Sequence, residues 1–185
     1  DAWGVQIVFD NQVILGTRAR KTRTKSFNAF SSIDYPETAM FRDRRLIQFL
    51  QRPAEYTHAV FSTALDPNVF VLRLVPGMRA DIIPLLEGRY RALVLESFGV
   101  GGLPGGDDGA MFAAVRDWCG AGHLAVFTTQ VPHEGSDLAV YEVGRAAKAL
   151  PGVLEAHDMT PEATAVKLMW VLGQTCLLYT SDAAD

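Results

Sequence analysis

Short, nearly unbroken runs of apolar residues recur through the second half of the chain. They are Val69–Val75, Ala92–Leu95 and Leu124–Thr128, and each is bounded by glycine, proline or polar residues. Runs of this length and composition are typical of parallel strands that are buried on both faces. We therefore expect these three segments to be neighbouring strands of one sheet.

Segments with helix signals lie between and after these strands. Asp107 or Asp108 is a candidate N-cap for one helix, and Thr160 followed by Pro161 is a typical start for another. Strands that alternate with helices over short loops predict a three-layer α/β fold with a parallel sheet. The helices are expected at about 80–86, 109–119 and 141–150, and from Pro161 onward.

The first forty residues follow a different pattern. Gly4–Phe9 and Gln12–Leu15 alternate as strands do, and Asp10-Asn11 between them suits a two-residue hairpin turn. A hairpin alone is only marginally stable, so these strands need a sheet that we do not expect the chain itself to supply. Residues 37–66 show no clean period, and we expect a linker there with one weakly indicated strand near Leu46–Leu50.

Composition narrows the function classes. The chain has 185 residues, 49% of them hydrophobic, and a net charge of −4, which argues against a polyanion as the main partner. No apolar run approaches the length of a membrane span, and no signal-peptide pattern is present. Cys119 and Cys176 lie too far apart to suggest a disulfide or metal framework, which fits a reducing, cytoplasmic setting.

The last ten residues, 176–185, read unlike the rest of the chain. They follow a helical pattern that stops abruptly, and they resemble the translation of a sequencing adapter. We therefore expect the natural sequence to end at Thr175, and no function is assigned to Cys176, Tyr179 or Asp182.

A basic stretch over residues 16–30 is the most unusual local feature. Five basic side chains fall within eight positions, and an aromatic pair, Phe27 and Phe30, follows them. Composition alone favours a solvated strand or loop. A nucleic-acid patch is disfavoured by the acidic balance of the whole chain, while a lysine with a chemical role remains open. The basic residues are Arg18, Arg20, Lys21, Arg23 and Lys25.

Two polar loops, 97–104 and 128–137, follow the second and third predicted strands. Ligands of open α/β sheets bind beyond the carboxyl ends of strands, where the strand order reverses. The first loop has Pro104 where a dinucleotide fingerprint needs its third glycine. In the second, His133 lacks a second histidine at zinc-binding spacing, and His133, Ser136 and Asp137 are too close in sequence to converge as a triad. We expect these polar residues to cap the loop.

Four motifs occur in order along the chain. Leu95–Pro104 reads L-E-S-F-G-V-G-G-L-P, Thr129-Gln130 precedes Tyr141–Gly144, and Asp158–Leu168 reads D-M-T-P-E-A-T-A-V-K-L. Together they resemble the L-x-[ST]-[YF]-G-x-G-N-x-P, T-Q…Y-x-x-G and D-M-T-x-E-A-x-x-x-K-L motifs of bacterial type I (cytoplasmic-type) L-asparaginases. The opening stretch matches the same family, without a gap, at Gly16, Lys21, Phe27, Phe30 and residues 34–36.

The resemblance implies an amidohydrolase that converts L-asparagine to L-aspartate and ammonia without metal or organic cofactor. In the family a threonine attacks the amide, a Thr-Lys-Asp set transfers protons, and the lysine falls on Lys21. A threonine hydroxyl needs a neighbour that accepts its proton, and an amine does so only when burial or nearby charge lowers its pKa. Arg18, Arg20 and Arg23 are candidates for that charge, although Arg18 and Arg20 fall on the opposite face of an extended strand.

Three departures from the family pattern limit what the resemblance implies. Gly102, the candidate substrate-binding position, stands where the family has an asparagine that reaches the neighbouring subunit's active site. Arg20 and Val131 replace a threonine and a cysteine of the allosteric asparagine site, so we expect no such regulation. The T-G-G-T and T-D-T motifs that supply the catalytic threonines and aspartate do not occur, so we expect the 185-residue chain to be inactive.

The resulting domain scheme has four parts. Residues 1–36 are expected to be a β-hairpin remnant of the N-terminal asparaginase domain, 37–66 a linker, 67–175 the C-terminal asparaginase domain and 176–185 the foreign tail. The expected partner is L-asparagine, with no nucleic acid or membrane, and the longer parent is expected to be a homodimer or homotetramer. The alternatives are an asparaginase-like subunit of a tRNA-dependent amidotransferase and a non-catalytic domain for small-molecule binding or oligomer assembly.

Overall fold

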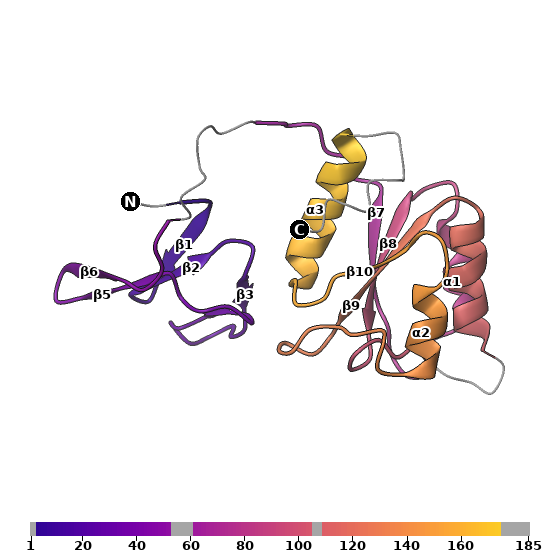
Figure 1. Ribbon diagram of the computed structural model, residues 1–185, viewed down its shortest axis with the longest axis horizontal. Coiled ribbons are helices and arrows are strands. Elements are labelled where there is room, and N and C mark those ends of the chain that lie inside the picture. The colour runs from indigo at the N-terminus through magenta and orange to yellow at the C-terminus, as the bar shows by residue number, and fades with distance from the viewer. Residues whose placement is uncertain (1–2, 53–60, 105–108, 175–185) are drawn as a thin grey trace. The chain divides into compact units, whose positions relative to one another are not determined.

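The structure is a computed structural model that describes residues 3–52, 61–104 and 109–174 (Figure 1). The chain divides into two compact units, Asp1–Phe61 and Ser62–Asp185. Several predicted features lie outside the described residues, namely the tail at 176–185 and the candidate N-caps Asp107 and Asp108.

The first unit contains a four-stranded antiparallel sheet in the order β1-β2-β5-β6. The predicted hairpin is present, because β1 (Gln6–Phe9) pairs with β2 (Gln12–Leu15). Asp10 and Asn11 in its turn both have positive φ, of 47° and 62°. This conformation matches the twist of the flanking strands, and aspartate and asparagine tolerate it better than most residues. The predicted turn is therefore confirmed.

The other two strands of this sheet come from the segment that was predicted to be a linker. β5 (Ala39–Arg42) pairs with β2, and β6 (Arg45–Gln48) pairs with β5. Residues 39–48 are thus not a linker, although the weakly indicated strand near Leu46–Leu50 is present as β6. The expectation that the chain lacks partners for its first hairpin is wrong. The second hairpin turns at Asp43-Arg44, where φ is 49° and 64°. An arginine at positive φ carries no turn signal in the sequence.

The basic stretch contributes a separate two-stranded ladder. β3 (Ala19–Lys21) pairs antiparallel with β4 (Phe30–Ser32), so that Lys21 lies opposite Phe30. β4 contacts β2 of the larger sheet. Within this stretch Arg20 and Lys21 thus lie on a strand, whereas Arg23 and Lys25 lie in the loop that follows it.

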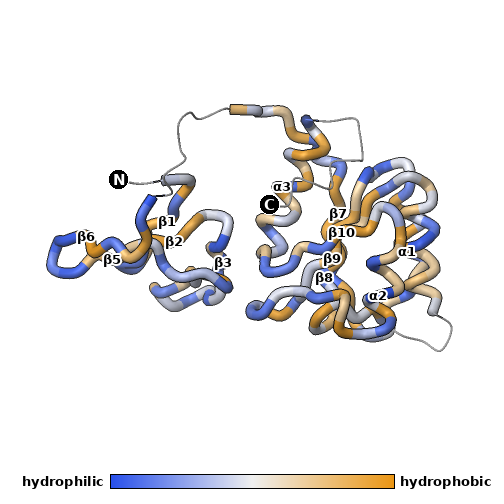
Figure 2. Tube along the Cα trace, viewed as in Figure 1, coloured by the Kyte–Doolittle hydropathy of each residue, from blue (hydrophilic) through white to orange (hydrophobic). Residues whose placement is uncertain are grey.

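The second unit is built on a four-stranded parallel sheet in the order β10-β9-β8-β7. Its central strands are completely buried, and Figure 2 shows the hydrophobic residues that run through the sheet. The three predicted strands are confirmed, whereas β10 was not predicted because it is only three residues long. The strands are β7 (Val69–Arg73), β8 (Ala92–Ser97), β9 (Leu124–Thr129) and β10 (Val153–Glu155).

Helices cover both faces of this sheet (Figure 1). α1 (Ala110–Gly120) and α2 (Glu142–Lys148) lie on one side, where Val115 packs in the same core cluster as Leu93 and Leu95. α3 (Pro161–Gln174) lies on the other side, where Leu168 belongs to the cluster of Val94. Successive residues of a strand point to opposite faces, so β8 supplies both cores. The predicted three-layer α/β fold is confirmed.

The order of the strands in space follows their order in the chain. Connections between parallel neighbouring strands are almost always right-handed. When each new strand is added at the same edge of the sheet, all of these connections therefore lie on the same face. Here the 3₁₀ turns, α1 and α2 fill that face, and α3 after the last strand covers the other. The described sheet has no point at which the strand order reverses, so the rule used for the two polar loops does not locate a ligand crevice in it.

The helices differ from prediction in two places. Residues 80–86 form two 3₁₀ turns, Ala80–Ile82 and Pro84–Leu86, because Pro84 lacks the N–H that a continuous helix would use. The helix predicted over 141–150 is shorter, as α2 shows. The predicted cap of α3 is present, since Thr160 Oγ1 accepts a hydrogen bond from Ala163 N–H at 3.2 Å.

Candidate functional site

Lys21, the predicted catalytic residue, is the last residue of β3 and its side chain is exposed. Beyond it the ladder continues, because Thr22 N–H donates to the Ala29 carbonyl at 2.8 Å and Thr22 Oγ1 lies 2.9 Å from Ser31 Oγ. The lysine therefore lies on a backbone that is hydrogen-bonded on both sides of it. This backbone fixes where the Lys21 side chain begins, and its head remains accessible.

An aromatic cluster anchors the loop that follows Lys21. The ring of Phe9 on β1 stacks on Phe27 at 5.1 Å between centroids and meets the edge of Phe30 at 5.2 Å. Offset and edge-to-face pairs of this kind stabilise by about 0.5–1.5 kcal/mol beyond their buried area. The spacing from Lys21 to Phe27 and Phe30 thus has a structural reason, because both rings tie the lysine segment to β1.

Two of the arginines near Lys21 have partners elsewhere. The guanidinium carbon of Arg18 lies 5.4 Å from the centroid of the Tyr35 ring, and Arg23 Nη1 donates to the Asn28 carbonyl at 2.9 Å. Arg20 and Lys21 are successive residues of a strand, so their side chains leave on opposite faces. In the described contacts, Arg18 therefore interacts with Tyr35 and Arg23 with the Asn28 carbonyl, and not with the side chain of Lys21.

The Thr-Gln pair after β9 joins three strands at the carboxyl edge of the second unit's sheet. Thr129 Oγ1 donates to the Gly99 carbonyl at 2.5 Å. Gln130 Nε2 donates to the carbonyls of Leu74 and Glu96, at 2.5 and 2.8 Å. The Glu96 carbonyl also accepts Leu74 N–H at 3.1 Å, so Gln130 is its second donor. These bonds tie the ends of the strands together, which gives the Thr-Gln motif a clear structural role.

Gly102, the predicted substrate-side position, closes a tight loop after β8. Gly102 N–H donates to the Phe98 carbonyl at 2.7 Å, and Phe98 N–H donates back at 2.9 Å. A Cβ at Gly102 would lie 3.3 Å from that carbonyl oxygen, so an asparagine here requires a small shift of Phe98. Lys21 belongs to the first unit and Gly102 to the second, and each is positioned by contacts within its own unit.

The polar residues of loop 128–137 form no triad. Asp137 Oδ1 accepts Ala139 N–H at 2.9 Å. Ser136 Oγ lies 3.5 Å from the carbonyls of Phe127 and His157. Both side chains serve backbone groups, so the prediction that they cap the loop is confirmed.

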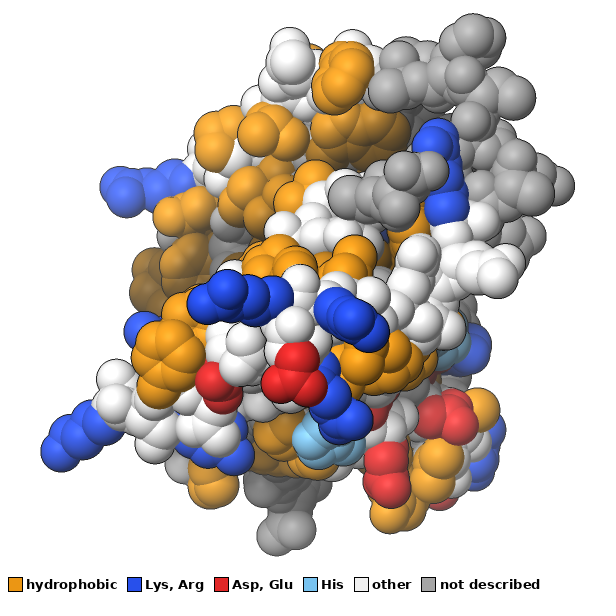
Figure 3. Space-filling model, turned by 90° about the vertical axis from the view of Figure 1, so that its left-hand side faces the viewer, with side chains coloured by type: hydrophobic (Ala, Val, Ile, Leu, Met, Phe, Trp, Pro, Cys, Tyr) orange, Lys and Arg blue, Asp and Glu red, His pale blue; other side chains and the backbone are white. Residues whose placement is uncertain are grey.

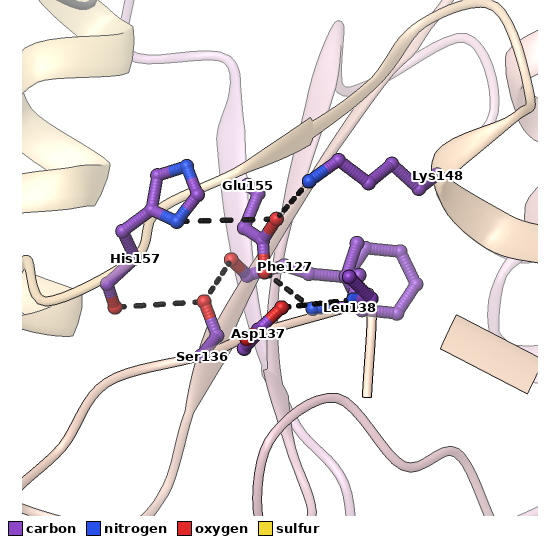
Figure 4. Close-up of polar contacts among 8 residues, drawn as sticks. Phe127, Ser136, Asp137, Leu138, Lys148, Glu155 and His157 are labelled. Carbon is purple, nitrogen blue, oxygen red and sulfur yellow. Dashed lines mark hydrogen bonds and ion pairs between the residues drawn. The ribbon is translucent and has the colours of Figure 1, made fainter. Parts of the chain in front are cut away.

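A buried carboxylate that the sequence did not reveal lies beside this loop (Figure 4). Glu155, the last residue of β10, accepts Leu138 N–H through Oε1 at 2.5 Å and pairs through Oε2 with Lys148 Nζ at 3.0 Å. His157 Nδ1 is 3.9 Å from the same Oε2. Only a fold that joins residues 17 positions apart reveals this group, because no motif surrounds Glu155.

A pocket of about 180 Å³ opens on the four-stranded sheet of the first unit. Trp3, Val8, Thr38 and Phe41 are among the residues that line it, and Lys21 is not. Figure 3 views the molecule from the side of β5 and β6, where hydrophobic and basic side chains lie next to one another at the surface. The pocket lining contains none of the predicted site residues.

Several other site types find no support in the described ranges. No three His, Cys, Asp or Glu side chains gather there as metal ligands would. None of the described helices is long and apolar enough to cross a bilayer. Burial raises the pKa of the Cys119 thiol to about 11, which makes this cysteine a poor nucleophile.

Comparisons with known sequences cover both units. The family model of the glutaminase/asparaginase C-terminal domain matches residues 68–178, and that of the asparaginase N-terminal domain matches residues 1–55. The L-asparaginase of Thermococcus kodakarensis is 38% identical over 173 residues, which are 93% of this chain and 52% of that protein. A glutamyl-tRNA(Gln) amidotransferase component from Metallosphaera sedula is 33% identical over 166 residues, or 86% of this chain and 36% of that protein.

Solved structures extend the likeness to the fold. The thermostable L-asparaginase from Thermococcus kodakarensis gives a TM-score of 0.87 at 36% identity, over 95% of this chain and 52% of that one. L-asparaginase I from Vibrio cholerae gives a TM-score of 0.80 at 26% identity, over 94% of this chain and 52% of that one. The chain thus spans about half the length of the asparaginases that it matches. One family model matches each unit, and the model of the C-terminal domain alone covers more than half of the chain. The chain therefore belongs to the glutaminase/asparaginase family.

Proposed function

We propose that this chain is part of a bacterial type I (cytoplasmic-type) L-asparaginase, which converts L-asparagine to L-aspartate and ammonia. The observation that carries the proposal is the 38% identity to an L-asparaginase over 93% of the chain, across both units. The activity needs no metal or organic cofactor, and the enzyme acts in the cytoplasm as a homodimer or homotetramer. Neither nucleic acid nor a membrane is a partner.

Lys21 is the residue of this chain that takes part in the chemistry. Its amine accepts, directly or through a relay, the proton that the attacking threonine loses, since a hydroxyl needs such a neighbour to act as nucleophile. Its position at the end of β3 leaves the amine accessible to groups from elsewhere. The burial or charge that this chemistry requires would have to come from those groups. Gly102 is proposed to lie at the substrate side of a neighbouring subunit's site, with less contact than the asparagine of relatives.

Two measurements test the proposal. The 185-residue chain contains neither threonine motif, so we expect it to release no ammonia from L-asparagine. In the longer protein that carries those motifs, Lys21→Met should lower kcat at least about a hundredfold, the lower range of general acid–base effects. Lys25→Met is the matched control, because Lys25 is an exposed lysine of the same stretch, and it should retain activity.

The results that contradict each part are distinct. Ammonia release by the 185-residue chain would refute its inactivity. A longer protein that hydrolyses L-asparagine equally well with Lys21→Met and with Lys25→Met would refute the role of Lys21. Size-exclusion chromatography of both variants checks that the assembly is intact.

A second candidate function is a component of a tRNA-dependent amidotransferase. The relative from Metallosphaera sedula, 33% identical over 166 residues, favours it. The net charge of −4 disfavours it, because tRNA binding depends on basic surface. Salt-dependent binding of tRNA by the longer protein would support this second function over the first.

A further inference from the structure

Glu155 is a charged residue buried at a crowded point of the second unit. Its side chain is only 5% exposed, yet both carboxylate oxygens have partners, Leu138 N–H at 2.5 Å and Lys148 Nζ at 3.0 Å. Burying a carboxylate is unfavourable unless hydrogen bonds and opposite charge compensate it. A merely space-filling residue at this place would be apolar, so the carboxylate must be explained by the groups that it holds.

Leu138, the residue that Glu155 binds, connects the two loops at the carboxyl edge of the sheet. It is 1% exposed, and its Cδ2 lies 2.5 Å from where a Cβ on Gly101 would stand. The next residue back, Asp137, donates its N–H to the Val100 carbonyl at 2.8 Å. Leu138 and Asp137 therefore support the backbone of residues 100–101 directly, one residue away from Gly102.

The space around Leu138 leaves little freedom. A Cβ on Gly144, at the start of α2, would collide with the Leu138 carbonyl oxygen, and one on Gly135 would lie 2.5 Å from the His157 carbonyl oxygen. The loop is thus held between α2 and the residues after β10. Within this close packing the Leu138 N–H points at Glu155 (Figure 4), and loss of the acceptor would leave a donor in a crowded place without its partner.

We propose that Glu155 is a positioning residue: through Leu138 its carboxylate fixes loop 129–138 and, by way of that loop, the Phe98–Gly102 turn. Lys148 neutralises the buried charge and contributes less to the positioning. That Gly102 lies on the substrate side rests on the proposed function, whereas the ordering of the two loops does not. The acceptor oxygen, rather than the volume of the side chain, carries the effect.

Amide hydrogen exchange of the 185-residue chain tests this, with three variants. Glu155→Met keeps the approximate volume but offers no acceptor, and Glu155→Gln keeps an acceptor without the charge. Lys148→Met removes only the ion pair. With Glu155→Met, exchange at Leu138, Asp137 and Gly102 should be at least about tenfold faster than in the wild type. With Glu155→Gln and Lys148→Met it should stay within about threefold of the wild type.

Other outcomes overturn the proposal. Exchange that is equally fast in the Met and Gln variants would show that the charge, and not an acceptor oxygen, carries the effect. Exchange at the wild-type rate in both variants would show that no acceptor is needed. Faster exchange at Leu138 with unchanged exchange at Gly102 would show that the effect stops at the first loop.

If Glu155→Met does not fold, the chemical shift of the Leu138 amide proton in Glu155→Gln tests the proposal instead. A carboxylate acceptor shifts it downfield, so it should move upfield in Glu155→Gln, and no movement overturns the proposal. None of these readouts requires turnover. A chain with ordered loops whose longer parent fails to hydrolyse L-asparagine would count against the proposed function alone.

Discussion

Asp66 shows how one side chain secures the entry to the second unit's sheet. Its carboxylate accepts Asn68 N–H at 2.9 Å and Arg91 Nη1 at 2.8 Å, just before β7 begins. The hydrogen bond from the Asn68 backbone, and then the Arg91 guanidinium, lower the pKa of Asp66. The charged form is therefore favoured in the folded chain, and this couples the stability of the second unit to pH.

Replacing Asp66 tests this coupling. Because the folded-state pKa is lowered, the stabilisation is present above the unfolded pKa and is lost as the pH falls through the folded value. We expect Asp66→Ala to lower the free energy of unfolding by about 1 kcal/mol at pH 7, since Arg91 is partly exposed. The difference from the wild type should shrink below the usual pKa range of aspartate.

Urea denaturation of the wild type and of Asp66→Ala at several pH values measures this difference in the free energy of unfolding. Asp81→Ala is the control, because Asp81 pairs with Arg79 where both side chains are well exposed, and it should change little. A loss with Asp66→Ala that is equally large at acid and neutral pH would contradict the assignment.

At the scale of elements, the ends of helices and hairpins decide where the chain turns. Thr160 caps α3 through Oγ1, Pro84 splits the segment before β8 into two short turns, and two hairpins reverse at pairs of residues with positive φ. Each of these devices acts over two or three residues. They fix boundaries, while burial of the apolar faces provides most of the stability.

The cap of α3 gives a prediction at this scale. Thr160→Ala leaves Ala163 N–H without its side-chain acceptor and should lower the free energy of unfolding by about 1 kcal/mol. Thr160→Ser keeps the hydroxyl and should lose less. Chemical denaturation followed by circular dichroism compares them, and equal losses in the two variants would mean that the methyl group, not the cap, is responsible.

The elements also show how far sequence reasoning reaches. Unbroken apolar runs such as Ala92–Leu95 were predictable because burial on both faces leaves a strong local pattern. β5 was not predictable and β6 was indicated only weakly, since four-residue strands whose turn contains Arg44 depend on a partner strand far away in sequence. The site follows the same rule: Lys21 could be identified from motif spacing, but the contacts of Glu155 arise only from the tertiary fold.

At the scale of the whole second unit, the two faces of the sheet are covered unequally. The 3₁₀ turns, α1 and α2 cover one face. Among the described residues, α3 is the helix on the other face. Its apolar side contains Ala165, Leu168 and Leu172, which pack on Val94 and Val126. The stability of this half of the core thus depends on one helix.

Truncating that helix is the corresponding test. Leu168→Ala should lower the free energy of unfolding of the second unit by about 2–5 kcal/mol, the range for buried leucines. Val166→Ala on the exposed side of the same helix should change it by about 0.5 kcal/mol or less. Tryptophan fluorescence in urea reports the transition, and a loss below about 1 kcal/mol for Leu168→Ala would contradict the dependence on α3.

A strand order that follows the chain order also has a kinetic consequence. Each strand from β8 to β10 pairs with the strand that precedes it in the chain, so every pairing closes a loop of a single crossover. Closing one crossover at a time loses less chain entropy than pairing strands that are separated by several crossovers. The second unit can therefore assemble one strand at a time during synthesis, beginning at β7, with β10 and then α3 joining last.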